Sequence, residues 1–170
     1  MKKFHICPNA YYNYKKDKKQ EYRKEKAYIQ RIMVAKCQCG REVIGTLNSN
    51  HIDAQLAIDT LRIALDRRKP AKGIILHSDQ GSQYTSKDFN EFCEKKHIQQ
   101  SMSKVGCPYD NVVMERFYNT FKNEYLNIHR FKTNEALDQG VYDFVYIKYN
   151  YIRPHRYNGG LTPYAARCAA

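Results

Sequence analysis

The chain of 170 residues is long enough to bury one core, and it carries a formal net charge of +12. No apolar stretch approaches the roughly 18 residues of a membrane span, and no apolar segment follows the lysine-rich start, so the sequence predicts a cytoplasmic protein without a membrane anchor or export signal. Fifteen tyrosines and seven phenylalanines accompany the charges, which favours nucleic acid as the partner because phosphates bind Lys and Arg while bases pack on rings.

The positive charge is concentrated at the start of the chain. Residues 1–31 hold ten Lys or Arg against three acids, a net charge of +7 that leaves +5 for the rest. Helix formers dominate residues 10–32, and we expect a basic helical arm over residues 1–31 followed by one domain over residues 32–170. A polyanion would bind such an arm, and a lysine-rich helix that only faces solvent explains the pattern equally well.

The cysteines are scattered, and without an export signal we expect reduced thiols. They are Cys7, Cys37, Cys39, Cys93, Cys107 and Cys168. Cys37 and Cys39 have the spacing of half a zinc site, but no second close pair of Cys or His completes four ligands. The sequence therefore does not favour structural zinc.

In the first half of the predicted domain, the sequence indicates a hairpin, a helix and a strand. Two short apolar segments within residues 31–47 flank a polar Cys-Gln-Cys-Gly centre, which predicts the hairpin. Asn50 is placed to cap a helix that has one apolar face at a period of 3.6 residues, with Asp53 three positions later. The run Gly-Ile-Ile-Leu-His at residues 73–77 is typical of a strand buried on both faces.

The second half continues the alternation of helices and strands. Ser86 is placed to cap a helix with an apolar side, and residues 98–102 predict another strand. A long helix is expected from Asn111 to about residue 127, and a last one from Thr133 to about residue 149 leads into a basic, turn-rich tail. This order predicts an α/β fold in which helices cross between strands of a sheet.

Two carboxylates mark the point where chemistry is expected. Asp79 lies where the apolar run ends, among small polar residues, and Glu115 follows after thirty-five intervening residues, one turn into the long helix. Phosphodiester transfer by two divalent ions needs carboxylates on rigid elements, because Mg²⁺ prefers oxygen ligands. Either carboxylate taken alone is explained as an ordinary surface or turn residue. His77, two residues before Asp79, is expected to be structural.

These segments resemble a known family. "HSDQGSQYTS" and the later "DNVVMERFYNTFKNEYL" are similar to the catalytic core of bacterial insertion-sequence transposases, and the similarity runs over about residues 40–165, including "REVIGTLNSNHIDAQLAIDTLRIAL" and "YNYIRPHRYNGGLTP". The resemblance implies an RNase H-like fold of the retroviral-integrase type, with a mixed sheet flanked by helices. It also implies a DDE enzyme that uses Mg²⁺ or Mn²⁺ to cut the ends of a mobile element and join them to target DNA.

The resemblance assigns roles residue by residue. Asp79 would be the second metal-binding aspartate and Glu115 the closing glutamate, and both would be catalytic. The residues expected to contact or admit DNA are Gly81, Ser82, Gln83, Tyr84, Asn111 and Lys122. In the tail, Arg153, His155 and Arg156 are candidate phosphate contacts, and a solvated basic turn is the alternative. The implied partners are element ends, target DNA, and either further copies of the chain or an intact transposase on the bacterial nucleoid.

The chain departs from the family pattern at its start. Such transposases carry a first aspartate on a leading strand, and no such strand is recognisable here. Asp17 lies at about the right distance but in a lysine-rich, helix-like segment, while Asp53 and Asp59 fit better as helix cap or surface. We therefore expect impaired strand transfer. The alternatives are a DNA-binding remnant that inhibits intact transposase, and a generic basic RNA-binding protein, which leaves the two carboxylates unexplained.

Overall fold

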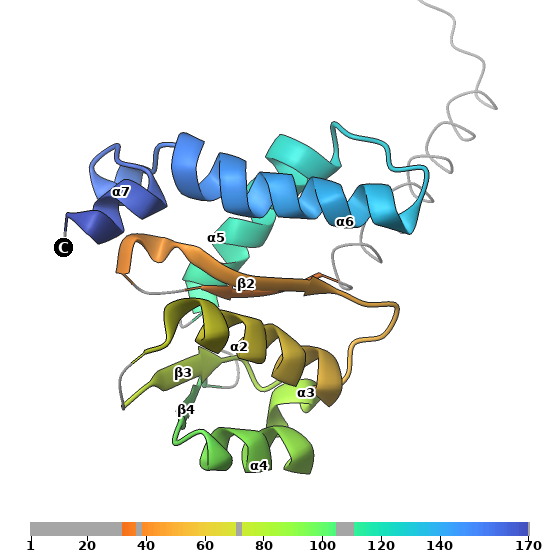
Figure 1. The fold of residues 1–170 in the computed structure, drawn as a ribbon, viewed down its shortest axis with the longest axis vertical. Coiled ribbons are helices and arrows are strands. Elements are labelled where there is room, and N and C mark those ends of the chain that lie inside the picture. Colours follow the sequence, from red (N-terminus) through yellow and green to blue (C-terminus); the bar gives the residue numbers. More distant parts are fainter. Residues whose placement is uncertain (1–31, 37–38, 71–72, 105–110, 170) are drawn as a thin grey trace, which may run out of the picture.

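A computed structural model describes residues 32–36, 39–70, 73–104 and 111–169 of the chain (Figure 1). The basic arm predicted over residues 1–31 and Cys37 therefore lie outside the described residues. Within the described part, no helix is long and apolar enough to cross a bilayer.

The predicted hairpin is confirmed. Strand β1 (Ile32–Lys36) pairs antiparallel with β2 (Val43–Asn48), and the register shifts by a bulge between Ala35 and Lys36. The short 3-10 turn η1 (Cys39–Arg41) joins the strands, and its Gly40 has a positive φ of 62° that glycine adopts at little cost.

Two further strands form a second, separate sheet. Strand β3 (Ile75–Ser78) pairs in parallel with β4 (Gln99–Met102), as expected for strands joined by a helical crossover. The predicted mixed sheet is thus divided, because no strand among the described residues pairs with both β1 and β3.

The strand β3 is covered on one face, so the prediction of burial on both faces was wrong. Ile75 is 65% exposed and His77 is exposed as well, whereas Ser78 is buried and Leu76 packs against an apolar cluster. Successive side chains of a strand point to opposite faces. The odd-numbered face of β3 therefore has no cover among the described residues.

Helix α2 (Ala54–Arg68) joins the two sheets through a common core. It packs against β1 and β2 on one side and against the helices α3 (Ser82–Thr85) and α4 (Lys87–Lys95) on the other. The shared core consists of apolar residues from these helices and the segment before β4, which are Leu56, Ala57, Ile58, Leu61, Phe89, Cys93 and Ile98. Leu47 of β2 and Leu76 of β3 both pack against it.

The caps of the two crossover helices are local side-chain bonds. Asp53 caps α2 by accepting from the Leu56 N–H at 2.8 Å, so the prediction of Asn50 as the cap was wrong by three residues. Ser86 caps α4 as predicted, with its hydroxyl accepting from the Phe89 N–H at 3.3 Å.

The two long helices predicted in the second half are present, and both end in wider turns. Helix α5 (Val112–Phe121) continues as the π-helical segment η3 (Lys122–Leu126), and α6 (Asn134–Tyr142) continues as η4 (Asp143–Ile152). They build a second, aromatic-rich core against β2, whose buried members are Val43, Phe117, Phe121, Leu126, Leu137, Val141, Phe144, Val145, Tyr146 and Tyr149. In Figure 1, α6 lies above the hairpin and α2 below it.

The tail is more ordered than the turn-rich pattern indicates. After the 3-10 turn η5 (Arg156–Asn158), the chain forms a short helix, α7 (Pro163–Cys168), which the sequence analysis missed. Its Thr162 cap accepts from the Ala165 N–H at 3.2 Å, and Pro163 occupies the first turn, where no backbone N–H is needed.

Candidate functional site

Asp79 lies immediately after β3, at the carboxyl end of the strand. Its Oδ1 accepts a hydrogen bond from the Gly81 N–H at 3.0 Å, and its side chain is exposed. The turn that follows is fixed to the residue after β4, because Gln80 Nε2 donates to the Ser103 carbonyl at 3.1 Å. One carboxylate oxygen is therefore used in the turn and the other faces outward from a fixed backbone.

His77 is held by the neighbouring strand. Its Nδ1 lies 3.0 Å from the Ser101 hydroxyl and its Nε2 lies 3.1 Å from the Ser103 hydroxyl. Both ring nitrogens are thus engaged across β3 and β4, which agrees with the structural role expected for this histidine.

Three of the predicted DNA contacts lie in the short helix α3, where the sequence had indicated a loop, and their settings differ. Ser82 is exposed, whereas Gln83 and Tyr84 are half-buried. Tyr84 packs against the α2 core with its ring edge-on to Phe89, at a centroid distance of 5.4 Å. Burial and the nearby charge of Asp79 raise the Tyr84 pKa to about 12, although a hydrogen bond with Gln83 lowers it. The hydroxyl of Tyr84 is therefore protonated at neutral pH, and its ring packs α3 against the core.

Glu115 lies in the first turn of α5 and is exposed. A carboxylate at this end of a helix is favoured by the unpaired N–H groups and the helix dipole. Asn111 occupies the N-cap position of α5 without a capping side-chain bond, and Lys122 begins η3, two turns after Glu115. In Figure 1, α5 passes behind the hairpin with its first turn directed towards the layer of β3 and β4.

The ligand set of a metal site is incomplete in the described part of the chain. Neither Asp79 nor Glu115 forms an ion pair there, and no group of three or more His, Cys, Asp or Glu among those residues is arranged to hold a metal ion. The two exposed carboxylates fit the preference of Mg²⁺ for oxygen ligands, but they are fewer ligands than the site needs. The convergence of Asp79 and Glu115 on one ion remains a prediction.

The other aspartates considered as ligands have different settings. Asp53 is the cap of α2, and Asp59 pairs with Arg62 at 2.7 Å on the surface of that helix, as predicted for both. Asp17 lies outside the described residues, as do Cys7 and Cys107. Cys93 is buried and Cys168 is exposed, and both are free thiols.

Two of the three tail residues expected to bind phosphate have partners within the chain. Arg153 donates to both carboxylate oxygens of Glu124, at 2.6 and 2.7 Å, and these bonds hold the Glu124 pKa below its usual range. His155 is buried, with its ring edge-on to Tyr149 at 4.5 Å. Arg156 is exposed. The tail is therefore not a simple solvated turn, and phosphate binding by Arg153, His155 and Arg156 remains a prediction.

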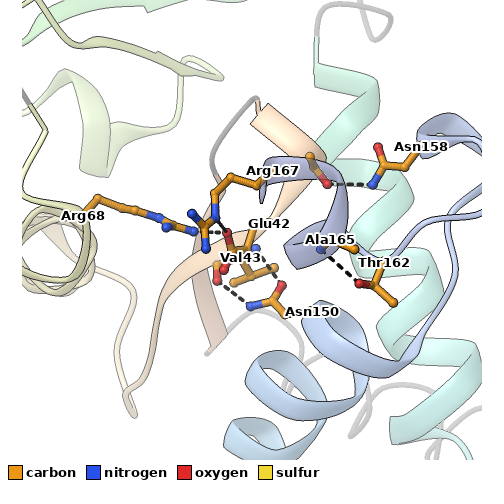
Figure 2. A network of polar contacts seen from close by, with 9 residues as sticks. Glu42, Val43, Arg68, Asn150, Asn158, Thr162, Ala165 and Arg167 are labelled. Atoms are coloured by element: carbon orange, nitrogen blue, oxygen red, sulfur yellow. Dashed lines mark hydrogen bonds and ion pairs between the residues drawn. The ribbon is translucent and has the colours of Figure 1, made fainter. Parts of the chain in front are cut away.

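A polar network that the sequence analysis missed fixes the tail to the hairpin (Figure 2). The buried carboxylate of Glu42 accepts hydrogen bonds from Arg68 of α2 and from Arg167 of α7, the latter at 2.7 Å. Asn158 Nδ2 donates to the Gly40 carbonyl at 2.9 Å. Three segments distant in the chain therefore meet at the start of β2.

The arrangement of helices and strands is that of an integrase-type core. Residues 17–108 match the family of integrase core domains, and residues 96–163 match a second model described as an integrase core domain. Because the first match covers more than half of the chain, the chain belongs to the integrase core domain family.

The curated relatives that it resembles are transposases of insertion sequences. The chain is 38% identical over 123 residues to the transposase InsF for insertion sequence IS3A of Escherichia coli strain K12. The aligned residues make up 72% of this chain and 43% of the relative. It is 36% identical over 115 residues to the transposase for insertion sequence element IS904 of Lactococcus lactis, covering 68% and 46%. The chain thus spans less than half the length of these relatives.

Solved structures with the same fold are retroviral integrases. The catalytic core domain of BIV integrase superposes with a TM-score of 0.58 at 20% identity, covering 81% of this chain and 85% of that one. The integrase catalytic core domain of HTLV-2 in complex with magnesium gives 0.55 at 17% identity, covering 80% and 82%. The predicted RNase H-like integrase-core fold is confirmed, and the fold is all that identity at this level shows.

Proposed function

We propose that this chain supplies the second aspartate and the closing glutamate of a metal-dependent DNA transposase core, and that its own strand transfer is impaired. One observation carries the proposal. Within the residues that match the integrase core family, Asp79 directly follows β3 and Glu115 stands in the first turn of α5, and both carboxylates are outward.

The proposed metal is Mg²⁺ or Mn²⁺. Asp79 and Glu115 would hold the metal. When bound, the ions would activate the attacking oxygen and stabilise the leaving oxygen. Phosphodiester transfer depends on the positions of two ions, so a set of two carboxylates is expected to leave the geometry loose. This is the physical reason for expecting impairment.

Metal binding tests the proposal without any need for activity. The full chain is titrated with Mn²⁺ by calorimetry, alongside Asp79→Asn and Glu115→Gln, and each substitution is expected to weaken binding by about tenfold or more. Asp88→Asn is the matched control, because Asp88 is an exposed acid in the first turn of α4. Equal affinities in all four proteins would remove the basis for the metal site.

Strand transfer is tested with a labelled element end and a target duplex. The purified chain is expected to join them poorly in Mg²⁺, and efficient Mg²⁺-dependent joining would refute the impairment. DNA of the element ends and of the target is the proposed partner, together with further copies of the chain or an intact transposase at the nucleoid of the bacterial cytoplasm. The DNA contacts proposed around the carboxylates are Ser82, Gln83, Tyr84, Asn111 and Lys122.

The second candidate is a DNA-binding remnant that inhibits an intact transposase. The charge favours it, because residues 148–168 contain Lys or Arg at four positions and no acid. Asp79→Asn separates the two candidates: an enzyme loses metal-dependent cleavage, whereas a binder keeps its DNA affinity or gains slightly from reduced repulsion. A generic RNA-binding protein, the third candidate, is expected to prefer RNA over element ends.

A further inference from the structure

The outer edges of the two sheets differ in whether their backbone groups are hydrogen-bonded. The outer edge of β2 is closed by side chains of η4, because Asn150 binds both backbone groups of Val43 and the Tyr146 hydroxyl accepts from the Thr46 N–H at 3.0 Å. Folded proteins commonly protect sheet edges in such ways, since unpaired N–H and C=O groups recruit other strands. The edge of β2 is therefore protected.

The outer edge of β3 has no such protection among the described residues. The carbonyls of Ile74 and Ser78 accept from the N–H groups of Gln99 and Ser103 at 2.9 Å, so the even-numbered residues of β3 face β4. Backbone groups alternate along a strand, and those of Ile75 and His77 consequently face the opposite edge. No described strand pairs there.

The composition of this edge suits another strand. β3 reads Ile-Leu-His-Ser and contains no Lys, acid or Pro, the residues that commonly prevent pairing at a sheet edge. β4, at the other edge of the same sheet, is more polar and reads Gln-Gln-Ser-Met. The Ile75 side chain is 65% exposed. An incoming apolar strand would cover it.

The two sheets are also built around one core. Leu47 of β2 and Leu76 of β3 pack against the same cluster on α2, yet β1 and β3 each have a single described partner strand. One extended segment with both edges free could pair with both sheets. Every described strand of a second copy already uses one of its edges, so none of those strands meets that requirement.

We propose that the open edge of β3 binds an extended apolar strand from a longer transposase chain of the same family. The matched segment covers 43% of the InsF relative, so more than half of that relative lies outside the match and is available as the source. Pairing through backbone groups tolerates sequence differences between the two chains. The choice of partner rests on the proposed function. The open edge itself is inferred from strand pairing and backbone hydrogen bonds alone.

The test uses the full 170-residue chain and overlapping synthetic peptides, each about 12 residues and so longer than a typical strand, that cover the InsF transposase of IS3A. Binding is measured by fluorescence anisotropy. We expect binding by peptides from the part of InsF that this chain does not match. Amide hydrogen exchange is expected to slow at Ile75 and His77 and to change little at Leu76 and Ser78, which already face β4.

A matched pair of variants locates the contact. Ile75→Lys is expected to weaken peptide binding by about tenfold or more, because the charge lies on the edge. Ile128→Lys changes an isoleucine of the same exposure, 68% against 65%, away from any strand, and is expected to bind as the wild type. Circular dichroism confirms that both variants fold.

Three results would overturn the proposal: no peptide binds, both variants weaken binding equally, or the chain forms a dimer that only Ile75→Lys abolishes, which would make a second copy the occupant. The Mn²⁺ titration is independent of these measurements. If peptides bind but Asp79→Asn keeps its metal affinity, the strand site is supported and the proposed metal site is refuted. If no peptide binds but Asp79→Asn loses metal affinity, the metal site is supported and the strand site is refuted.

Discussion

The side chain of Asn150 forms the two hydrogen bonds with the Val43 backbone that a neighbouring strand would otherwise form. Its Oδ1 accepts from the Val43 N–H at 3.0 Å, and its Nδ2 donates to the Val43 carbonyl at 2.8 Å. Both residues are almost completely buried, so no water replaces either bond at that site. The side chain thereby ties η4 to the first residue of β2 across 107 positions of the chain.

Asn150→Leu is expected to destabilise the fold strongly. The substitution keeps a similar volume and leaves a buried N–H and a buried C=O without partners, at a cost of roughly 2–4 kcal/mol in the free energy of unfolding. Urea denaturation measures it. Asn123→Leu, at an exposed position, is the control and is expected to change stability by no more than about 0.5 kcal/mol. Similar losses in both variants would show that the bonds to Val43 contribute little.

Gly40→Ala and Gly159→Ala separate backbone strain from close packing. Their φ angles are almost equal, 62° and 64°, so Ala costs about 1–2 kcal/mol at either position for its left-handed conformation. A Cβ at Gly40 would lie 2.3 Å from the Pro163 carbonyl oxygen, whereas one at Gly159 would meet nothing within 4 Å. We expect Gly40→Ala to be less stable than Gly159→Ala by a further amount of about 1–3 kcal/mol.

Limited trypsin digestion gives a second measurement for the same pair. Displacement of α7 in Gly40→Ala would free Arg167 from Glu42 and expose the chain after that arginine to cleavage. Cleavage there is expected to accelerate in Gly40→Ala and to stay at the wild-type rate in Gly159→Ala. Identical rates would show that α7 stays docked despite the added methyl group.

The pair of Glu124 and Arg153 is expected to make stability depend on pH in the acid range. Hydrogen bonds from Arg153 lower the Glu124 pKa in the folded state, so the stabilisation is present above the unfolded pKa of about 4.3 and is lost as pH falls through the lower folded value. Glu124→Gln should cost about 1 kcal/mol or less at pH 7, because the carboxylate is partly solvated.

Urea denaturation of the wild type and Glu124→Gln as a function of pH measures this effect. The difference in stability is expected to shrink as pH falls below about 4. A difference that is constant between pH 7 and pH 3 would show that packing, and not the charge of Glu124, accounts for the loss.

The thiols of Cys93 and Cys168 are expected to react at very different rates. Burial raises the Cys93 pKa to about 11, so little thiolate forms at pH 8, and the side chain is enclosed in the α2 core. Cys168 is exposed. Iodoacetamide followed by peptide mass mapping should label Cys168 in the folded protein and Cys93 only after denaturation. Rapid labelling of Cys93 in the folded protein would contradict the packed core.

The logarithm of the DNA-binding constant is expected to fall linearly with the logarithm of salt concentration, because phosphate contacts release counterions. Arg156→Gln should reduce the magnitude of that slope by about one, as for the loss of one phosphate contact. Arg62→Gln removes the same charge from an arginine that pairs with Asp59, and should leave the slope unchanged. Equal slopes for both variants would place Arg156 outside the interface.

Local signals account for the parts of the fold that were predicted correctly. The hairpin, the Ser86 cap of α4 and the helix that begins after Asn111 depend on residues within a few positions of one another. The same locality explains the error at α2, because Asn50 and Asp53 are both good cap residues and only the folded geometry shows which one reaches an N–H.

The candidate site was predictable in part for the same reason. The ends of β3 and the first turn of α5 are set by sequence pattern, so the positions of Asp79 and Glu115 on their elements followed from the sequence. The environment of β3 did not follow, because an apolar run has the same appearance whether one face or both are covered. Ile75 is exposed only because no described element packs on that face.

The sequence by itself determined the order of helices and strands, the family, and the placement of two carboxylates at the ends of rigid elements, since these depend on short-range periodicity, caps and motifs. Tertiary structure alone decided that Arg153 binds Glu124 and that Glu42 binds Arg167, pairs separated by 29 and 125 positions. It also decided that side chains close the outer edge of β2, whereas the outer edge of β3 has no partner within the described ranges. Hydrogen-bond and charge partners at such separations follow from the packing of whole elements, and no local pattern encodes them.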